Sequence, residues 1–215
     1  MMKGYQKEFL EFAIRCDALR FGTFALKSGR ISPYFFNTGM FNTGERLARL
    51  GGFYASALTE RNHSFDMVFG PAYKGVPLAC ALAIALARDH SRDIPYAFNR
   101  KQVKAYGEGG IVVGHPLQGR VLIVDDVISA GTSVRESVQI INAAGATVAG
   151  VVISIDRQER GQGPLSAVEE VEKELGQPVV SIANLDTLLA FLSVQGDCAR
   201  DHYAAIENYR QQYGA

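Results

Sequence analysis

Apolar residues in this chain follow two recurring patterns. Short runs rich in valine and isoleucine are bounded by glycine and polar residues, and longer segments between them repeat apolar residues every three or four positions. The runs predict strands and the longer segments predict helices. We expect strands at residues 67–70, 97–99, 121–124, 148–155 and 179–182, and helices near residues 75–89, 133–144, 164–175 and 186–194. Because the two alternate, the chain is expected to form an α/β fold: a doubly wound, mainly parallel sheet flanked by helices.

The N-terminal part of the chain has a different pattern. A helical stripe covers residues 5–16, and residues 24–37 alternate in the manner of a hairpin. Asn42, followed three residues later by Glu45, is typical of a helix N-terminus and predicts a helix that ends near Arg61.

No long linker or internal repeat divides the chain, so one domain is expected over residues 1–215. Within it we expect a small N-terminal hood at about residues 1–41, completed by parts of the C-terminal region. The core is then expected at about residues 42–195.

The charge balance limits the possible partners. Lys and Arg together number 22, as do Asp and Glu, so no general basic field favours nucleic acid or a membrane surface. The three cysteines have neither metal-site spacing nor a disulfide pattern, and the N-terminus is too polar for a secretory signal. The longest apolar run, residues 76–87, is too short to span a bilayer. These features favour a cytoplasmic protein that binds small molecules.

Candidate chemistry is densest at residues 121–133. Asp125 and Asp126 directly follow an apolar run whose character suits a strand covered on both faces, so they are expected at the carboxyl edge of the sheet. Paired carboxylates there can accept hydrogen bonds from the two neighbouring hydroxyls of a ribose. The small, hydroxyl-rich residues 129–133 and the helix after them suit a phosphate group. The run therefore predicts a site for a phosphorylated sugar.

Two further segments carry local positive charge. Residues 69–75 form a glycine-bounded turn between an expected strand and helix with Lys74 inside it, which suits a second anion but is at least as often purely structural. Arg100, Lys101 and Lys104 precede a glycine-rich stretch and are expected on a mobile flap, although a solvated surface loop explains most such runs.

The run at residues 121–133 resembles the phosphoribosyl pyrophosphate (PRPP) signature of type I phosphoribosyltransferases. Residues 24–37 and 100–109 are similar to those of the orotate phosphoribosyltransferase family. The resemblance implies the type I fold and transfer of a 5-phosphoribosyl group from PRPP to orotate, a step of pyrimidine biosynthesis. It also implies Mg²⁺, carried mainly by PRPP without direct protein ligands, and a homodimer in which the flap at residues 100–110 reaches the neighbouring subunit.

The resemblance also assigns roles to individual residues of this chain. The PRPP-binding residues are Lys27, Tyr73, Lys74, Arg100, Lys101, Lys104, Tyr106, Asp125, Asp126, Val127, Ile128, Ser129, Ala130, Gly131, Thr132 and Ser133. The catalytic residues among them are Lys74, Arg100, Lys101, Lys104, Asp125 and Asp126. The orotate-binding residues are Phe35, Phe36, Ser129 and Arg157. From the residues alone, the phenylalanines suit a hood core and Arg157 suits a surface ion pair equally well.

One position departs from the family pattern. Ala105 and Tyr106 stand where family members usually carry an acid and a histidine, and a phenol cannot supply the positive charge of an imidazolium. We expect the reaction to be retained with an altered rate or pH dependence. Two alternatives remain open: a phosphoribosyltransferase for another base, and a PRPP-sensing regulatory protein on the same fold.

Overall fold

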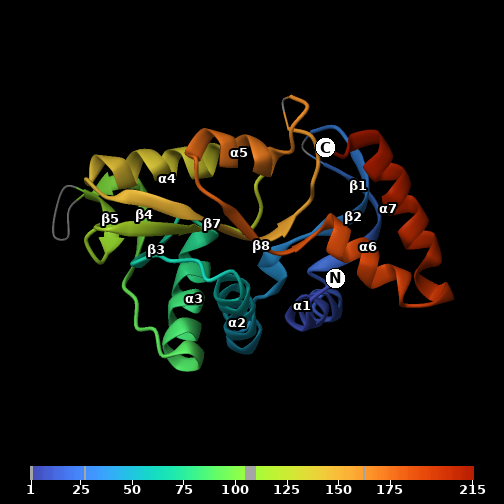
Figure 1. The fold of residues 1–215 in the computed structure, drawn as a ribbon, viewed down its shortest axis with the longest axis horizontal. Helices are drawn as coiled ribbons and strands as arrows, with labels where there is room; N and C mark the ends of the chain where they lie inside the picture. Colours follow the sequence, from blue (N-terminus) through green and yellow to red (C-terminus); the bar gives the residue numbers. More distant parts are fainter. Residues whose placement is uncertain (1, 27, 105–109, 162) are drawn as a thin grey trace.

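The computed structural model describes residues 2–26, 28–104, 110–161 and 163–215, without the side chains of residues 103, 104 and 198. Its centre is a six-stranded sheet in the order β5-β4-β3-β6-β7-β8 (Figure 1). The strands are β3 (Met67–Gly70), β4 (Tyr96–Lys104), β5 (Gly110–Gly114), β6 (Arg120–Val124), β7 (Thr147–Asp156) and β8 (Val179–Asn184). All neighbouring pairs are parallel except β4 and β5, which are antiparallel. The expected doubly wound, mainly parallel sheet is confirmed.

Helices cover both faces of this sheet. The helices below it in Figure 1 are α1 (Gly4–Arg15), α2 (Gly44–Glu60) and α3 (Gly75–His90), and those above it are α4 (Thr132–Ala143) and α5 (Ala167–Leu175). The chain then continues through α6 (Leu185–Ser193), a 3₁₀ turn (Asp197–Ala199) and α7 (Arg200–Tyr213). No helix in the described ranges is long and apolar enough to cross a membrane.

A separate antiparallel hairpin lies beside the sheet, formed by β1 (Leu19–Ala25) and β2 (Ile31–Phe36). Figure 1 shows it at the right of the molecule, where β2 packs against α7. One apolar cluster includes Tyr34 and Phe36 of the hairpin, Leu50 of α2 and Ile206 of α7. The hairpin is therefore joined to the body of the protein by a shared core.

Several expected boundaries need correction. The N-cap of α2 is Thr43, whose hydroxyl accepts from the Arg46 N–H, and not Asn42. Helix α5 begins at Ala167 rather than near residue 164, because Ser166 and Glu169 form a reciprocal capping box.

Two elements were not expected from the sequence. They are the edge strand β5 and the C-terminal helix α7. Pairing with β5 extends β4 to Lys104, so Arg100 and Lys101 lie on a strand and not in a loop.

Candidate active site

The acid pair lies at the carboxyl edge of the sheet. Strand β6 runs between β3 and β7, and its residues Val121–Val124 are fully buried, as expected for a strand covered on both faces. The Asp125 N–H donates to the Val152 carbonyl at 3.0 Å, and the Ser154 N–H donates to the Asp126 carbonyl at 2.9 Å. These bonds to β7 fix the backbone of both acids where the strand ends.

Asp125 is buried and accepts protein hydrogen bonds on both oxygens. The Asp126 N–H donates to its Oδ1 at 2.8 Å, and the Ser133 hydroxyl donates to its Oδ2 at 2.9 Å. Burial, followed by the negative charge of Asp126, raises the pKa of Asp125 to about 6. The Tyr54 hydroxyl also donates to the Asp125 carbonyl at 2.8 Å and so helps to hold the backbone of the acid pair. Burial thus disfavours the charged form of this carboxyl group.

Asp126 connects three segments of the chain. Its Oδ2 lies 2.5 Å from the Lys74 ammonium and accepts from the Thr38 hydroxyl at 2.9 Å, while its Oδ1 accepts from the Val127 N–H. Thr38 follows the hairpin and is held in a 3₁₀ turn that Asn37 caps. The structure therefore brings the predicted Lys74 and Asp126 together and adds Thr38, which sequence reasoning missed.

The segment at residues 127–133 connects the acid pair to α4. Gly131 has φ +70°, a conformation that favours glycine, and α4 begins at the next residue. Ser129, Ala130 and Thr132 are exposed, and the predicted Ser133 faces Asp125. A loop of small residues at the positive end of a twelve-residue helix is suited to a phosphate group.

The turn that carries Lys74 is tightly packed against β6. A Cβ added to Gly75 would lie 2.9 Å from the Val124 carbonyl oxygen, so this close approach requires glycine. The peptide between Ala72 and Tyr73 is cis, and the Ala72 N–H donates to Asn99 Oδ1 at 2.8 Å. Asn99, on β4, is a further supporting residue that the sequence did not reveal. The Tyr73 side chain is exposed.

The other predicted cations have different positions. Arg100 and Lys101 lie on β4, and Arg100 donates to the Gly110 carbonyl at 3.3 Å. The backbone of Lys104 pairs with Gly110, whereas its side chain, Lys27 and Tyr106 lie outside the described residues.

Three of the four residues expected to bind a base lie on or beside the hairpin, and the fourth, Ser129, lies in the loop before α4. Arg157, just after β7, donates to the Ser32 hydroxyl at 3.0 Å and to Glu159 at 2.7 Å, with its guanidinium 4.2 Å from the centre of the Tyr34 ring. The Phe36 ring packs in the core. The Phe35 ring, on the other face of β2, stacks on Phe24 with centroids 5.5 Å apart. Their contact with a base remains a prediction.

Comparison with known proteins identifies the family. The model of the phosphoribosyl transferase domain matches residues 37–180. Orotate phosphoribosyltransferases of Cronobacter sakazakii and Yersinia enterocolitica are 60% and 58% identical over 99% of this chain and the full length of each relative. The crystal structure of the Francisella tularensis orotate phosphoribosyltransferase, 40% identical, superposes with a TM-score of 0.88 over 97% of this chain and 100% of that chain. The chain therefore belongs to the orotate phosphoribosyltransferase family of phosphoribosyl-transferring enzymes.

Proposed function

We propose that the protein transfers the 5-phosphoribosyl group of PRPP to N1 of orotate, forming orotidine 5′-monophosphate and pyrophosphate. The observation that carries the proposal is the contact between Lys74 and Asp126 at 2.5 Å, next to buried Asp125 and the loop before α4. The carboxylates proposed to accept from ribose hydroxyls, the loop proposed to bind phosphate and the cation proposed to bind the diphosphate thus lie at one edge of the sheet. Membership in the orotate phosphoribosyltransferase family supports orotate as the acceptor.

In the proposed reaction the protein mainly positions its substrates. Asp125 and Asp126 accept hydrogen bonds from the ribose hydroxyls, and residues 127–133 bind the 5′-phosphate. The bond between the anomeric carbon and the diphosphate breaks as N1 of orotate bonds to that carbon, the electron pair of the broken bond leaves with pyrophosphate, and the N1 proton passes to solvent. Lys74, whose side chain is 58% exposed, exchanges Asp126 for a diphosphate oxygen and stabilises the departing charge. We expect Arg100, Lys101 and Lys104 to add charge on the same side.

The donor set around the acid pair fits a Mg²⁺ ion that arrives with PRPP. Each of the four carboxylate oxygens of Asp125 and Asp126 already accepts a hydrogen bond from the protein. Within the described ranges, no three His, Cys, Asp or Glu side chains are grouped to hold a metal ion. Mg²⁺ retains several waters and favours substrate phosphates, so PRPP oxygens would supply most of its ligands. The ion neutralises diphosphate charge when bound.

Base competition tests the acceptor. The purified protein is incubated with PRPP, Mg²⁺ and an equimolar mixture of orotate, uracil, adenine and hypoxanthine, and the nucleotide products are separated by chromatography. We expect orotidine 5′-monophosphate as the dominant product. A different nucleotide would support a transferase for another base. Binding of PRPP without any nucleotide product would support a sensor.

A homodimer is proposed on the basis of family membership, and three exposed apolar side chains are compatible with it. Tyr73, Ile84 on α3 and Tyr96 at the start of β4 are 73%, 61% and 40% exposed. Tyr73 also belongs to the Lys74 turn, so this exposed side chain lies beside the site. A second copy would cover these side chains and, in this family, bring its flap to the neighbouring site.

Subunit mixing tests this arrangement. A variant with Lys101→Ala and Lys104→Ala is unfolded and refolded together with an Asp125→Asn variant. If each site combines residues of two subunits, random pairing restores about a quarter of wild-type activity, because half of the dimers are mixed and each has one intact site. Activity equal to the average of the two parents would contradict the shared site.

The free thiols of Cys16 and Cys80 are compatible with the reducing cytoplasm that we expect for this enzyme.

A further inference from the structure

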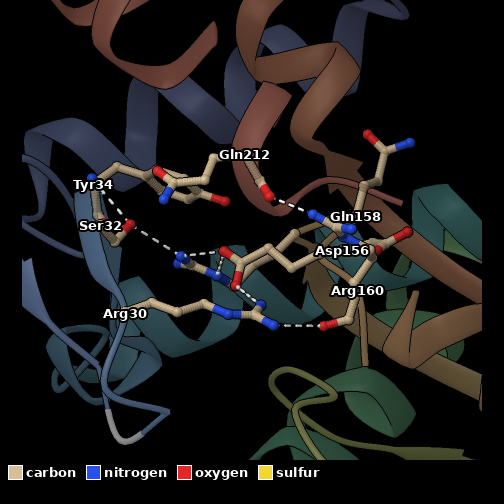
Figure 2. A network of polar contacts seen from close by, with 9 residues as sticks. Arg30, Ser32, Tyr34, Asp156, Gln158, Arg160 and Gln212 are labelled. Atoms are coloured by element: carbon tan, nitrogen blue, oxygen red, sulfur yellow. Dashed lines mark hydrogen bonds and ion pairs between the residues drawn. The ribbon is translucent and has the colours of Figure 1, made fainter. Parts of the chain in front are cut away.

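Three charged side chains join the hairpin to the segment after β7. Glu159 accepts from Arg157 Nε at 2.7 Å on one oxygen and from Arg30 Nη1 at 3.2 Å on the other. Arg157 Nη2 also lies 2.5 Å from the first oxygen and 3.0 Å from the Ser32 hydroxyl. Figure 2 shows this network, with Arg30 and Ser32 on the hairpin side facing the segment that carries Arg160. Glu159 is thus the only carboxylate among the described contacts of Arg30 and Arg157.

The charges of this network do not balance. The side chains of Arg30, Arg157 and Glu159 are 23%, 17% and 13% exposed, so solvent screens them only partly. Two guanidinium groups share one carboxylate. Tyr34 supplies no further negative charge, because burial raises the pKa of its phenol, and it meets Arg157 with its ring face. The network retains a positive charge that an anionic ligand can neutralise.

The backbone of Glu159 is held by the C-terminal segment. Glu159 forms an antiparallel bridge with Gly214, and the Arg160 N–H donates to the Tyr213 carbonyl at 2.9 Å. The Ala215 N–H donates to the Gln158 carbonyl at 3.1 Å, and Arg30 lies 5.1 Å from the centre of the Tyr213 ring. The C-terminal segment therefore holds the backbone of Glu159, and Arg30 and Arg157 hold its carboxylate, before any ligand binds.

We propose that Glu159 is a positioning residue for the base: it holds two nitrogens of Arg157 and thereby orients the guanidinium toward the orotate carboxylate. The inference rests on the proposed function and adds a residue that does not touch the substrate. Arg157 lies at the carboxyl end of β7, next to the strand that carries the acid pair. Glu159 and Ser32 already engage Nε and Nη2 of Arg157, so Nη1 is the nitrogen offered to a substrate carboxylate, and the hold of Glu159 sets the direction in which Nη1 points.

Glu159→Gln tests the proposal, because glutamine retains the shape of the side chain and removes its charge. The KM for orotate, the KM for PRPP and kcat are measured for the wild type, for Glu159→Gln, for Arg157→Ala and for the double variant. Glu60→Gln is the matched control, because Glu60 also pairs with a cation, Lys3, but lies on the exposed surface between α1 and α2. Urea unfolding of each protein records stability separately.

We expect Glu159→Gln to raise the KM for orotate about tenfold, equal to about 1.4 kcal/mol, and to leave kcat and the KM for PRPP within about twofold. In the Arg157→Ala background, the same substitution should change the KM for orotate by less than about twofold, because Glu159 acts through Arg157. The control should match the wild type.

Other results separate the possible failures. An unchanged KM for orotate in Glu159→Gln, or a rise that persists without Arg157, would overturn the positioning role and leave only a structural link between hairpin and core. If Glu159→Gln does not fold, Glu159→Asp keeps the charge and shortens the side chain. A smaller, orotate-specific rise in KM then supports the proposal, and equal rises for both substrates contradict it. A wild type that does not consume orotate would instead refute the proposed function.

Discussion

Asp125→Asn should stabilise the fold while it impairs the reaction. Burial and the charge of Asp126 raise the pKa of Asp125 from its ordinary value of 3.8 to about 6 in the folded protein. The folded state therefore binds this proton more tightly than the unfolded state, and stability falls as the pH rises through the interval from about 4 to about 6. A shift of about two pKa units corresponds to about 3 kcal/mol of unfavourable energy at pH 7 and above.

Asparagine removes this charge and retains the geometry. Its amide oxygen can accept from the Asp126 N–H, and its amide nitrogen can donate to the Ser133 hydroxyl. We expect the free energy of unfolding to increase by about 2 to 3 kcal/mol at pH 8 and to change little near pH 4, where the wild-type carboxyl is protonated. Phosphoribosyl transfer should fall at least about a hundredfold, because a charged acceptor for ribose is lost.

Urea unfolding, followed by circular dichroism at one protein concentration, measures the free energy of unfolding of the wild type and of the variant at pH 4 and at pH 8. A variant that is less stable than the wild type at both pH values would refute the argument, since the hydrogen bonds of Asp125 would then outweigh the cost of its buried charge. Asp126→Asn is the informative comparison. It removes an equal charge but also the partner of Lys74, so a smaller gain in stability is expected.

Two other substitutions test the supporting structure. Gly75→Ala would place a Cβ 2.5 Å from Pro71 Cδ and 2.9 Å from the Val124 carbonyl, so we expect a loss of about 1 to 3 kcal/mol in urea unfolding and a marked fall in activity as the Lys74 turn shifts. Full stability would contradict the packing. Thr43→Ala should cost about 1 kcal/mol with normal turnover, and Asn42→Ala clearly less, because Thr43 caps α2. Equal losses in thermal unfolding would argue against the corrected cap.

The central part of the fold could be predicted because its signals are local. The apolar run before Asp125 forms a strand buried on both faces, and the residues after it form the loop and helix expected of a phosphate site. Strand β5 was missed because only three apolar residues lie between its two terminal glycines, and those three are half-exposed at the sheet edge. Helix α7 was missed because among its described residues only Ile206 and Tyr209 are buried, too few to form a clear apolar stripe.

The arrangement of the site depended on contacts between distant residues. Thr38 and Asp126 are 88 residues apart, and Arg30 and Glu159 are 129 residues apart, so no sequence spacing indicated either contact. The expected helix start at Asn42 was one residue early because two good capping residues adjoin and only tertiary structure selects between them. Local patterns therefore indicated which residues carry the chemistry. The distant residues that hold those side chains in place could be identified only from the folded structure.

The most direct test of the central claim is the ultraviolet absorbance of orotate after the purified protein is mixed with PRPP, with and without Mg²⁺. The wild type should consume orotate only when Mg²⁺ is present, and an Asp125→Asn, Asp126→Asn double variant that remains folded should consume almost none. Stable orotate absorbance with the wild type, or undiminished consumption by the double variant, would contradict the assignment of this acid pair to phosphoribosyl transfer.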